Sequence, residues 1–277
     1  MKKIQEILGI AVTRIAREIE ANIIVSIDSI PDIEYEDTDD FQVKIIIFKK
    51  IKEEVYRKTE YVIKIKNLEY GSITPVKEII MDAITKGHIN KGDTVICTQD
   101  SKLGFGYKGV IFIFEIDDTF FQISRHKLSE KIGSEVIEAT LNISKEIAQE
   151  GREGKRVGTA FIIGNISELS KYMKQLIINP FQNLEEKPKV TDPKMRESIK
   201  EFAQLDGVFI LDEEGHIISA GTYINIDHSD INLPEGFGTK HRSAIALTSK
   251  TDSLAIVISE SGGKIRVIKA GKIILKI

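Results

Sequence analysis

The chain has 277 residues, of which 42% are hydrophobic and 29% are charged, and its formal net charge at pH 7 is −3. This length suits one large domain or two ordinary ones. The nearly balanced charge argues against a general nucleic-acid-binding protein, which would carry a surplus of basic residues. We therefore expect no nucleic-acid partner.

Three features predict a cytoplasmic protein with no membrane partner. The single cysteine, Cys97, cannot form a disulfide within the chain, and it follows Val95 and Ile96 in a run typical of a buried strand. No apolar run approaches the roughly 18 residues that a membrane-spanning helix needs. Glu6 and Arg14 interrupt the N-terminal segment, so we expect no signal peptide.

The first part of the chain alternates helical and strand patterns. Apolar spacings of three and four predict a helix over residues 1–20. Its buried face would consist of Ile4, Leu8, Ala11, Ile15 and Ile19. Short runs rich in isoleucine and valine predict strands at residues 22–27, 43–48, 61–65, 94–97 and 110–114. The acidic residues 32–40 predict an exposed loop.

A second helix is expected over residues 74–86. Thr74 can cap its start, Pro75 suits its first turn, and Gly87 ends it. The alternation of strands and helices predicts a small α/β domain over residues 1–125.

Part of this domain resembles the C-terminal domain of pyruvate kinase. The similar stretches are residues 72–76 and 91–96, and in that fold a helix start at such residues can hold a phosphate. Ser72 and Thr74 equally suit an ordinary helix cap. Residues 101–106 contain Gly-x-Gly without a strand-to-helix context, which predicts a loop.

A long helix over residues 129–150 is expected to connect this domain rigidly to a second one, over residues 126–277. The apolar side of the helix would consist of Ile132, Val136, Ala139, Ile143 and Ile147. Strands are predicted at residues 157–163, 207–211, 217–220, 253–259, 264–268 and 272–277, and helices at residues 167–176, 192–205 and 243–249. Turns are expected at residues 179–180 and 212–215. The second domain should therefore be a mixed central sheet flanked by helices.

Two carboxylates are candidate metal ligands. Asp206 lies where a predicted helix gives way to a strand, and Glu260 follows a predicted strand. Carboxylate oxygens suit Mg²⁺ or Mn²⁺, and α/β proteins gather ligands at strand ends. The alternatives are an ordinary turn aspartate and a solvated strand end.

Residues in and around the Lys240–Arg242 segment suit the binding of a triphosphate. Lys240, His241 and Arg242 are cationic or potentially cationic donors, and they precede the helix predicted from Ser243. The hydroxyls of Thr239 and Ser259, and the backbone at Gly207 and Gly238, provide further donors that can approach phosphate. The alternatives are a basic loop without function and a packed histidine.

The segment from Glu150 to the C-terminus resembles the diadenylate cyclase domain, the DisA_N or DAC type, of the archaeal subgroup with a pyruvate-kinase-C-terminal-like first domain. The family's Asp-Gly-Ala and Arg-His-Arg motifs correspond here to residues 206–208 and 240–242. Residues 150–155, 157–159 and 179–181 are also similar to the family. Val208 and Lys240 depart from it: Val208 adds two methyl groups, and Lys240 loses the forked geometry of arginine.

The resemblance implies the condensation of two ATP into cyclic di-AMP and two pyrophosphates, with Mn²⁺ or Mg²⁺ as the cofactor. Each subunit would hold one ATP, so the reaction needs two sites that face each other in a homo-oligomer. The resemblance places the adenine pocket at Gly221, Thr222, Tyr223 and Ile224. A core tyrosine is the alternative for Tyr223.

Two other readings of the same residues stay open. One is a non-catalytic sensor of ATP or a cyclic dinucleotide that degenerated from the cyclase, for which Val208 and Lys240 are the only support. The other is an unrelated α/β interaction module whose motifs are turns and caps.

Overall fold

The computed structural model describes residues 4–29, 40–52, 55–66, 73–99, 109–128, 131–227, 229 and 237–277. The chain divides into two compact units, Met1–Lys127 and Leu128–Ile277. Each unit is built on its own mixed sheet with helices, which confirms the predicted α/β class. The likeness of the first unit to pyruvate kinase stays a prediction.

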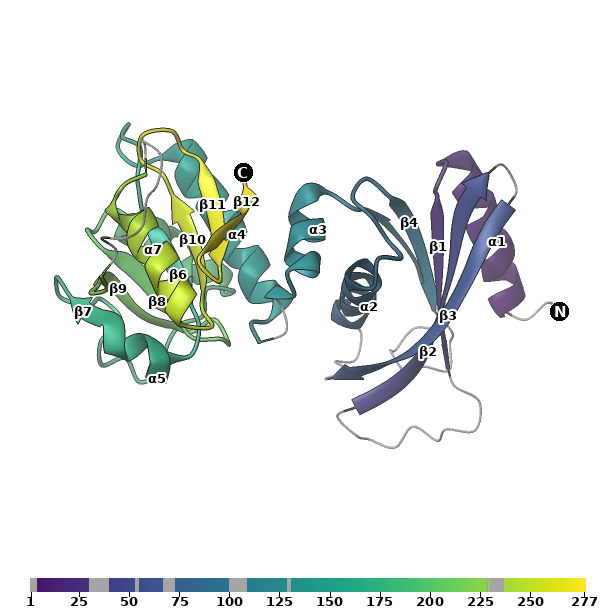
Figure 1. Cartoon of the computed structure of the whole chain (residues 1–277), viewed down its shortest axis with the longest axis horizontal. Helices are drawn as coiled ribbons and strands as arrows, with labels where there is room; N and C mark the ends of the chain where they lie inside the picture. The colour runs from purple at the N-terminus through teal and green to yellow at the C-terminus, as the bar shows by residue number, and fades with distance from the viewer. Residues whose placement is uncertain are drawn as a thin grey trace. The chain divides into compact units, whose positions relative to one another are not determined.

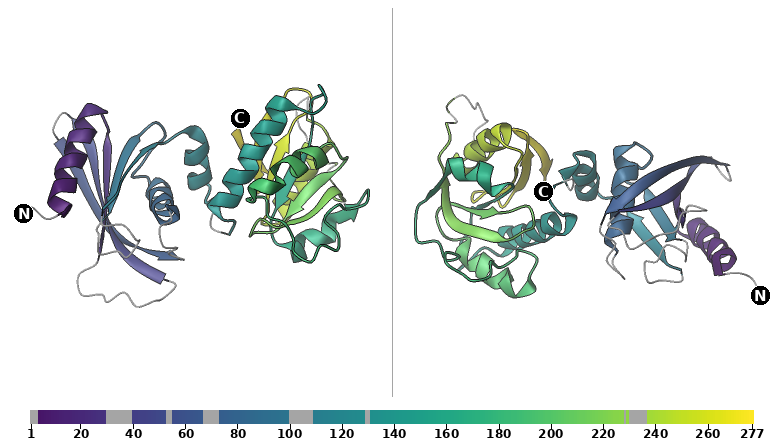
Figure 2. Two further views of the ribbon diagram at one scale, coloured as in Figure 1. Left: turned by 180° about the vertical axis from the view of Figure 1, so that it is seen from behind. Right: turned by 90° about the horizontal axis from the view of Figure 1, so that it is seen from below.

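The first unit contains a five-stranded sheet in the order β3-β2-β1-β4-β5. Its strands are β1 (Ile23–Ser29), β2 (Asp40–Lys52), β3 (Val55–Lys66), β4 (Thr94–Gln99) and β5 (Ile111–Glu115). Strands β1 and β4 are parallel, and the other neighbours are antiparallel. Helices α1 (Ile4–Glu18) and α2 (Thr74–Thr85) lie on opposite faces of this sheet (Figures 1 and 2).

Successive side chains of a strand point to opposite faces of the sheet, which explains why this unit has two hydrophobic cores. Val25 and Ile27 of β1 are buried in the cluster that includes α2, whereas Ile24 packs with Ile96 and α1 on the other face. Cys97 is fully buried in the first cluster, and this burial raises the pKa of its thiol. The thiol is therefore a packing group here.

Two predictions for this unit were wrong in detail, and one helix was missed. Helix α1 buries Val12 and Ala16, whereas Ile4 is 49% exposed, so the buried face lies beside the predicted one. Thr74 does not cap α2, because it is the first helical residue and follows Ile73 at the cap position. Helix α3 (Asp118–Arg125) was not predicted, although Asp117 caps it by accepting from Phe120 N at 2.7 Å.

Several other expectations for this unit fall outside the described residues. They concern residues 32–39 of the predicted loop, Ser72, and residues 101–106. Among the helices that the structure describes, none is long and apolar enough to cross a membrane.

The second unit contains a seven-stranded sheet in the order β12-β11-β10-β6-β8-β9-β7. Its strands are β6 (Ala160–Ile163), β7 (Met173–Gln175), β8 (Val208–Leu211), β9 (Ile217–Ile224), β10 (Leu254–Ile258), β11 (Ile265–Lys269) and β12 (Lys272–Lys276). Only β6 and β8 pair in parallel; the remaining neighbours are antiparallel. The predicted mixed central sheet is confirmed.

Helices cover both faces of this sheet. Helix α7 (Thr239–Lys250) lies on one face and α4 (Ser134–Glu150) on the other (Figures 1 and 2). Ala244 and Leu247 of α7 pack with Ala255 and Val257 of β10 in one buried cluster. All five residues of β10 are buried, as expected for a strand covered on both sides.

The largest errors in this unit concern helices. The helix predicted at residues 167–176 is only α5 (Ile166–Leu169) and a 3₁₀ turn (Ser170–Tyr172), after which the chain forms β7. The helix predicted at residues 192–205 is a 3₁₀ turn (Pro193–Met195) followed by α6 (Arg196–Phe202).

Candidate active site

Asp206 lies between the end of α6 and the start of β8. Its side chain is 85% exposed, and its Oδ1 accepts a hydrogen bond from Gly207 N at 2.9 Å. Gly207 has φ +108°, and a Cβ atom there would lie 2.6 Å from the backbone carbon of Gly221. Only glycine fits this close approach of β8 and β9, so the Asp-Gly pair presents a solvated carboxylate on a tightly fixed backbone.

A cavity of about 870 Å³ opens beside Asp206. It lies among the start of β8, the end of β9, the start of α7 and the end of β10. Its lining consists of Lys155, Arg156, Gly158, Leu176, Asp206, Gly207, Val208, Thr222, Tyr223, Ile224, Gly238, Thr239, Lys240, His241, Ser243, Ile258, Ser259, Glu260 and Ser261. All the predicted site residues belong to it except Gly221 and Arg242.

Lys240 joins two walls of this cavity. Its Nζ donates to the carbonyl of Gly158 at 2.7 Å and lies 3.9 Å from Asp206 Oδ1. The residue lies in the first turn of α7, which begins at Thr239 and not at Ser243 as predicted. Lys240 to Arg242 therefore belong to the helix start, where N–H groups and the helix dipole favour anions.

Glu260 lines the cavity two residues after the end of β10 and is exposed. A Cβ atom on Gly158 would lie 2.7 Å from Glu260 Cβ, so a glycine is needed where the two segments pass. Ser259 is 8% exposed, and its hydroxyl lies 3.3 Å from the hydroxyl of Ser261.

His241 is a neutral packing group. Only 3% of it is exposed, and its Nε2 accepts from Arg266 Nη1 at 3.0 Å, because a guanidinium only donates. Its ring meets that of Phe237 edge to face at a centroid distance of 5.1 Å. Burial, and secondarily the charge of Arg266, lower the pKa of His241 from 6.5 to about 4. Burial and the lowered pKa favour the packed-histidine alternative for this residue.

The predicted adenine pocket contains residues of different kinds. Tyr223 is 36% exposed, whereas Thr222 is fully buried and its Oγ1 lies 2.6 Å from Ser219 Oγ. Gly221 does not line the cavity: its φ is +67°, and a Cβ there would lie 2.5 Å from Ile177 Cγ1. Of the four residues, Tyr223 has the ring surface that a base can stack on.

Part of the chain that holds this site is similar to known proteins. Residues 146–273 match the family model described as DAC, DisA bacterial checkpoint controller nucleotide-binding. The chain is 29% identical over 234 residues to the diadenylate cyclase of Methanocaldococcus jannaschii, covering 83% of this chain and 74% of that protein. Residues 146–273 are therefore similar to the diadenylate cyclase family. The predicted resemblance to enzymes of this class is confirmed.

Two further relatives of the family are similar to shorter parts of the chain. The diadenylate cyclase of Haloferax volcanii is 35% identical over 142 residues, covering 51% of this chain and 52% of that protein. The cyclic di-AMP synthase CdaA of Bacillus subtilis is 25% identical over 190 residues, covering 62% of each.

The cavity has a cationic rim that the sequence did not reveal. Lys155 and Arg156 line it, and Arg156 Nη1 donates to the carbonyl of Ser261 at 3.2 Å. Both residues follow a tight turn and carry no periodic pattern. The available signal was that Lys155 ends residues 150–155, which resemble the family, and that Arg156 lies between them and residues 157–159.

The two candidate metal ligands suit a cation that enters the cavity already bound to a phosphate. Asp206 and Glu260 line one cavity, and both side chains are exposed. Mg²⁺ is commonly held by one or two carboxylates together with substrate phosphates, which is the donor set available here. Within the described part of the chain, three clustered metal-binding side chains occur only at Asp212, Glu214 and His216 in the β8–β9 turn.

Proposed function

We propose that this protein condenses two ATP molecules into cyclic di-AMP and two pyrophosphates at the cavity around Asp206. The observation that carries the proposal is the convergence of Asp206, Lys240 and Glu260 in one cavity. These residues come from three distant segments, within the part of the chain that matches the cyclase family. The relatives named diadenylate cyclase and cyclic di-AMP synthase support the same product.

The start of α7 would hold the phosphates of ATP. Gly238 occupies the cap position without a side-chain cap, which leaves first-turn N–H groups to an anion. Lys240 adds a charge at the same place, and Lys155 and Arg156 add two more at the rim. Phosphoryl transfer depends mainly on positioning and charge neutralisation, so this donor set suits departing pyrophosphate.

Asp206 and Glu260 would hold Mg²⁺ or Mn²⁺. When bound, such a cation neutralises phosphate charge and lowers the pKa of a coordinated hydroxyl. Lys240 neutralises part of the Asp206 charge at 3.9 Å and fixes the Gly158 segment through its hydrogen bond. Arg242 does not line the cavity, so we assign its contribution to α7 and not to direct phosphate contact.

Two chains would be needed for one product molecule. The Asp-Gly and Lys-His-Arg motifs each occur once in the sequence, so one chain offers one such site. Three consecutive apolar residues beside the cavity, Leu176, Ile177 and Ile178, are 45%, 39% and 91% exposed. Exposed apolar segments of this kind favour association, and Leu176 of this segment lines the cavity.

The second candidate is a sensor that binds ATP without turnover. The observation that favours it is the engagement of Lys240, which is already bonded to Gly158 within the chain. Incubation of the purified protein with ATP and Mn²⁺ or Mg²⁺, followed by mass spectrometry of the product, separates the candidates. We expect cyclic di-AMP; bound ATP without product would overturn the enzyme in favour of the sensor.

A further inference from the structure

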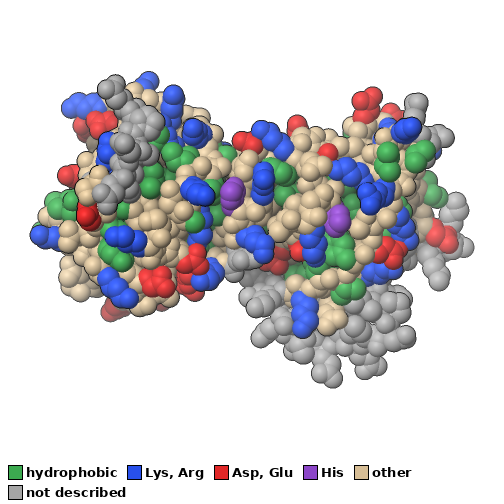
Figure 3. Space-filling view, in the orientation of Figure 1, with side chains coloured by type: hydrophobic (Ala, Val, Ile, Leu, Met, Phe, Trp, Pro, Cys, Tyr) green, Lys and Arg blue, Asp and Glu red, His purple; other side chains and the backbone are tan. Residues whose placement is uncertain are grey.

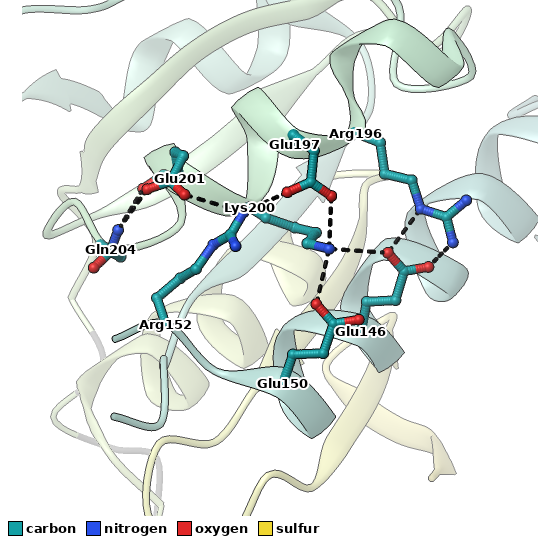
Figure 4. Close-up of polar contacts among 8 residues, drawn as sticks. All are labelled: Glu146, Glu150, Arg152, Arg196, Glu197, Lys200, Glu201 and Gln204. Atoms are coloured by element: carbon teal, nitrogen blue, oxygen red, sulfur yellow. Dashed lines mark hydrogen bonds and ion pairs between the residues drawn. The ribbon is translucent and has the colours of Figure 1, made fainter. Parts of the chain in front are cut away.

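A cluster of ion pairs joins three segments of the second unit (Figure 4). The segments are the end of α4, the turn that follows it, and α6. The cluster consists of Glu146, Glu150, Arg152, Arg196, Glu197, Lys200, Glu201 and Gln204.

Lys200 is the centre of the cluster. Its side chain is only 7% exposed, and its Nζ lies 2.8 Å from carboxylate oxygens of Glu150 and Glu197 and 3.5 Å from Glu146. Hydrogen bonds to Glu150 and Glu197 raise the pKa of Lys200. Arg196 Nε also donates to Glu146, at 2.7 Å. Helices α4 and α6 are thus held together by complementary charges.

Arg152 connects the turn after α4 to the same helix. Its Nη2 lies 2.8 Å from Glu197 Oε2 and 3.1 Å from Glu201 Oε1, which are one helical turn apart on α6. Lys200 and, after it, Arg152 lower the pKa of Glu197 to about 2. Both ion pairs use the same nitrogen of Arg152, while its buried Nε has no hydrogen-bond partner among the described atoms.

The turn that Arg152 opens carries the cationic rim of the cavity. Arg152 and Lys155 exchange two backbone hydrogen bonds, of 2.9 and 2.8 Å, around Glu153 and Gly154. The φ values of these two central residues are +48° and +75°, as in a tight type I′ turn. Lys155 therefore leaves the turn in a fixed direction and lines the cavity with Arg156, whereas Arg152 is not part of the lining.

Helix α6 carries the other wall. It ends at Phe202, and hydrogen bonds from Gln204 N to Glu201 O and from Leu205 N to Phe202 O continue the turn to Asp206. Arg152 therefore ties the rim cations to the segment that presents Asp206. We propose that Arg152 is a positioning residue that sets the place of Lys155 and Arg156 relative to Asp206, and thereby the affinity for the triphosphate of ATP. This role rests on the proposed function.

The test is a direct titration of ATP with Mg²⁺ onto wild-type protein and variants. We expect Arg152→Gln to weaken ATP binding by about threefold to thirtyfold, which lies within the range of couplings between contacting residues. Arg152→Lys should restore most of the affinity, because one ammonium can replace the nitrogen that makes both ion pairs. Lys194→Gln is the matched control, since it removes one cation just before α6 and Lys194 has no side-chain partner within the described residues; it should bind like wild type.

A double-variant comparison distinguishes positioning from general stability. If Arg152 acts through the rim, Arg152→Gln should add little to the loss in Lys155→Gln/Arg156→Gln. If the losses multiply instead, or if Arg152→Gln binds ATP like wild type, the positioning role is wrong. Cyclic di-AMP formation by wild type is measured in the same samples. Its absence would count against the proposed function alone, because the titration still reports on the rim.

Discussion

Two lysines of the second unit show how differently one charge can be used. Lys200 is 7% exposed on its side chain and lies within 3.5 Å of three carboxylates, whereas Lys240 is 31% exposed, with one backbone hydrogen bond and Asp206 at 3.9 Å. The first lysine is saturated by its neighbours. The second keeps donor capacity beside an open cavity, as a phosphate ligand requires.

The acidic partners differ in the same way. Asp206 is 85% exposed and accepts only the adjacent Gly207 N–H in the described structure, while Glu146, 18% exposed, contacts both Arg196 and Lys200. Charged side chains on the face drawn in Figure 3 are otherwise interspersed in sign, as the small net charge suggests. We therefore expect charged side chains with few partners to bind ligands, and charged side chains with several partners to stabilise the fold.

Asp206→Asn should have the largest effect on activity. Cyclic di-AMP synthesis should fall by at least about a hundredfold, the typical cost of losing one preorganised charged group at a reaction centre. Thermal unfolding should be nearly unchanged, because the side chain is exposed. Steady-state rates and melting curves on the same preparation check both parts. A variant that turns over ATP at the wild-type rate would remove Asp206 from the site.

Acidification should destabilise the second unit through His241. As the pH falls from 6.5 toward about 4, the unfolded chain takes up a proton that the buried ring resists, so stability present above pH 6.5 is lost. The loss should reach about 2–3 kcal/mol near pH 4, at about 1.4 kcal/mol per pH unit. Urea unfolding of wild type and His241→Gln over this range gives the measurement. Parallel curves for the two proteins would contradict a depressed pKa.

Lys200→Met should mainly affect stability. Its removal leaves three carboxylates without their common counter-ion. We expect a loss of about 2 kcal/mol, at the lower part of the range for charged hydrogen bonds because Glu150 and Glu197 are solvated. Chemical denaturation measures it, with Lys194→Gln as the control for loss of one charge. Unchanged stability would show that the cluster contributes nothing net.

Lys240→Arg should have the smallest effect. It restores the family's Arg-His-Arg motif and keeps the charge, so the Michaelis constant for ATP should change by no more than about threefold. An inactive variant would show that the bond from Lys240 to Gly158 O requires an ammonium.

The sequence predicted the sheets better than the helices. Runs such as Leu254–Ile258 are apolar at every position, which identifies a strand buried on both faces. Residues 173–175, Met-Lys-Gln, carry no such pattern, and they form β7 only because β9 offers its free edge. Helix α7 begins at Thr239 because Gly238 takes the cap position, although Lys240 to Arg242 lack the apolar spacing of its later turns.

Part of the site could also be predicted from the sequence, and part of it could not. Asp206 and Lys240 could be picked out because residues 206–208 and 240–242 resemble two motifs of the family, and Glu260 because a carboxylate follows a predicted strand. The neutral state of His241 could not, because it depends on Arg266 and Phe237 of other segments. Arg152 was missed for the same reason, since its partners lie 45 and more residues away on α6.

Subunit mixing shows whether one product molecule needs two chains. Asp206→Asn chains are titrated into wild type at fixed total protein, and cyclic di-AMP formation is measured after subunit exchange. If each product needs two facing sites, an equal mixture should retain about one quarter of the wild-type rate, because only wild-type pairs can close the ring. Retention of one half, together with full specific activity in a demonstrated monomer, would contradict synthesis between two chains at this cavity.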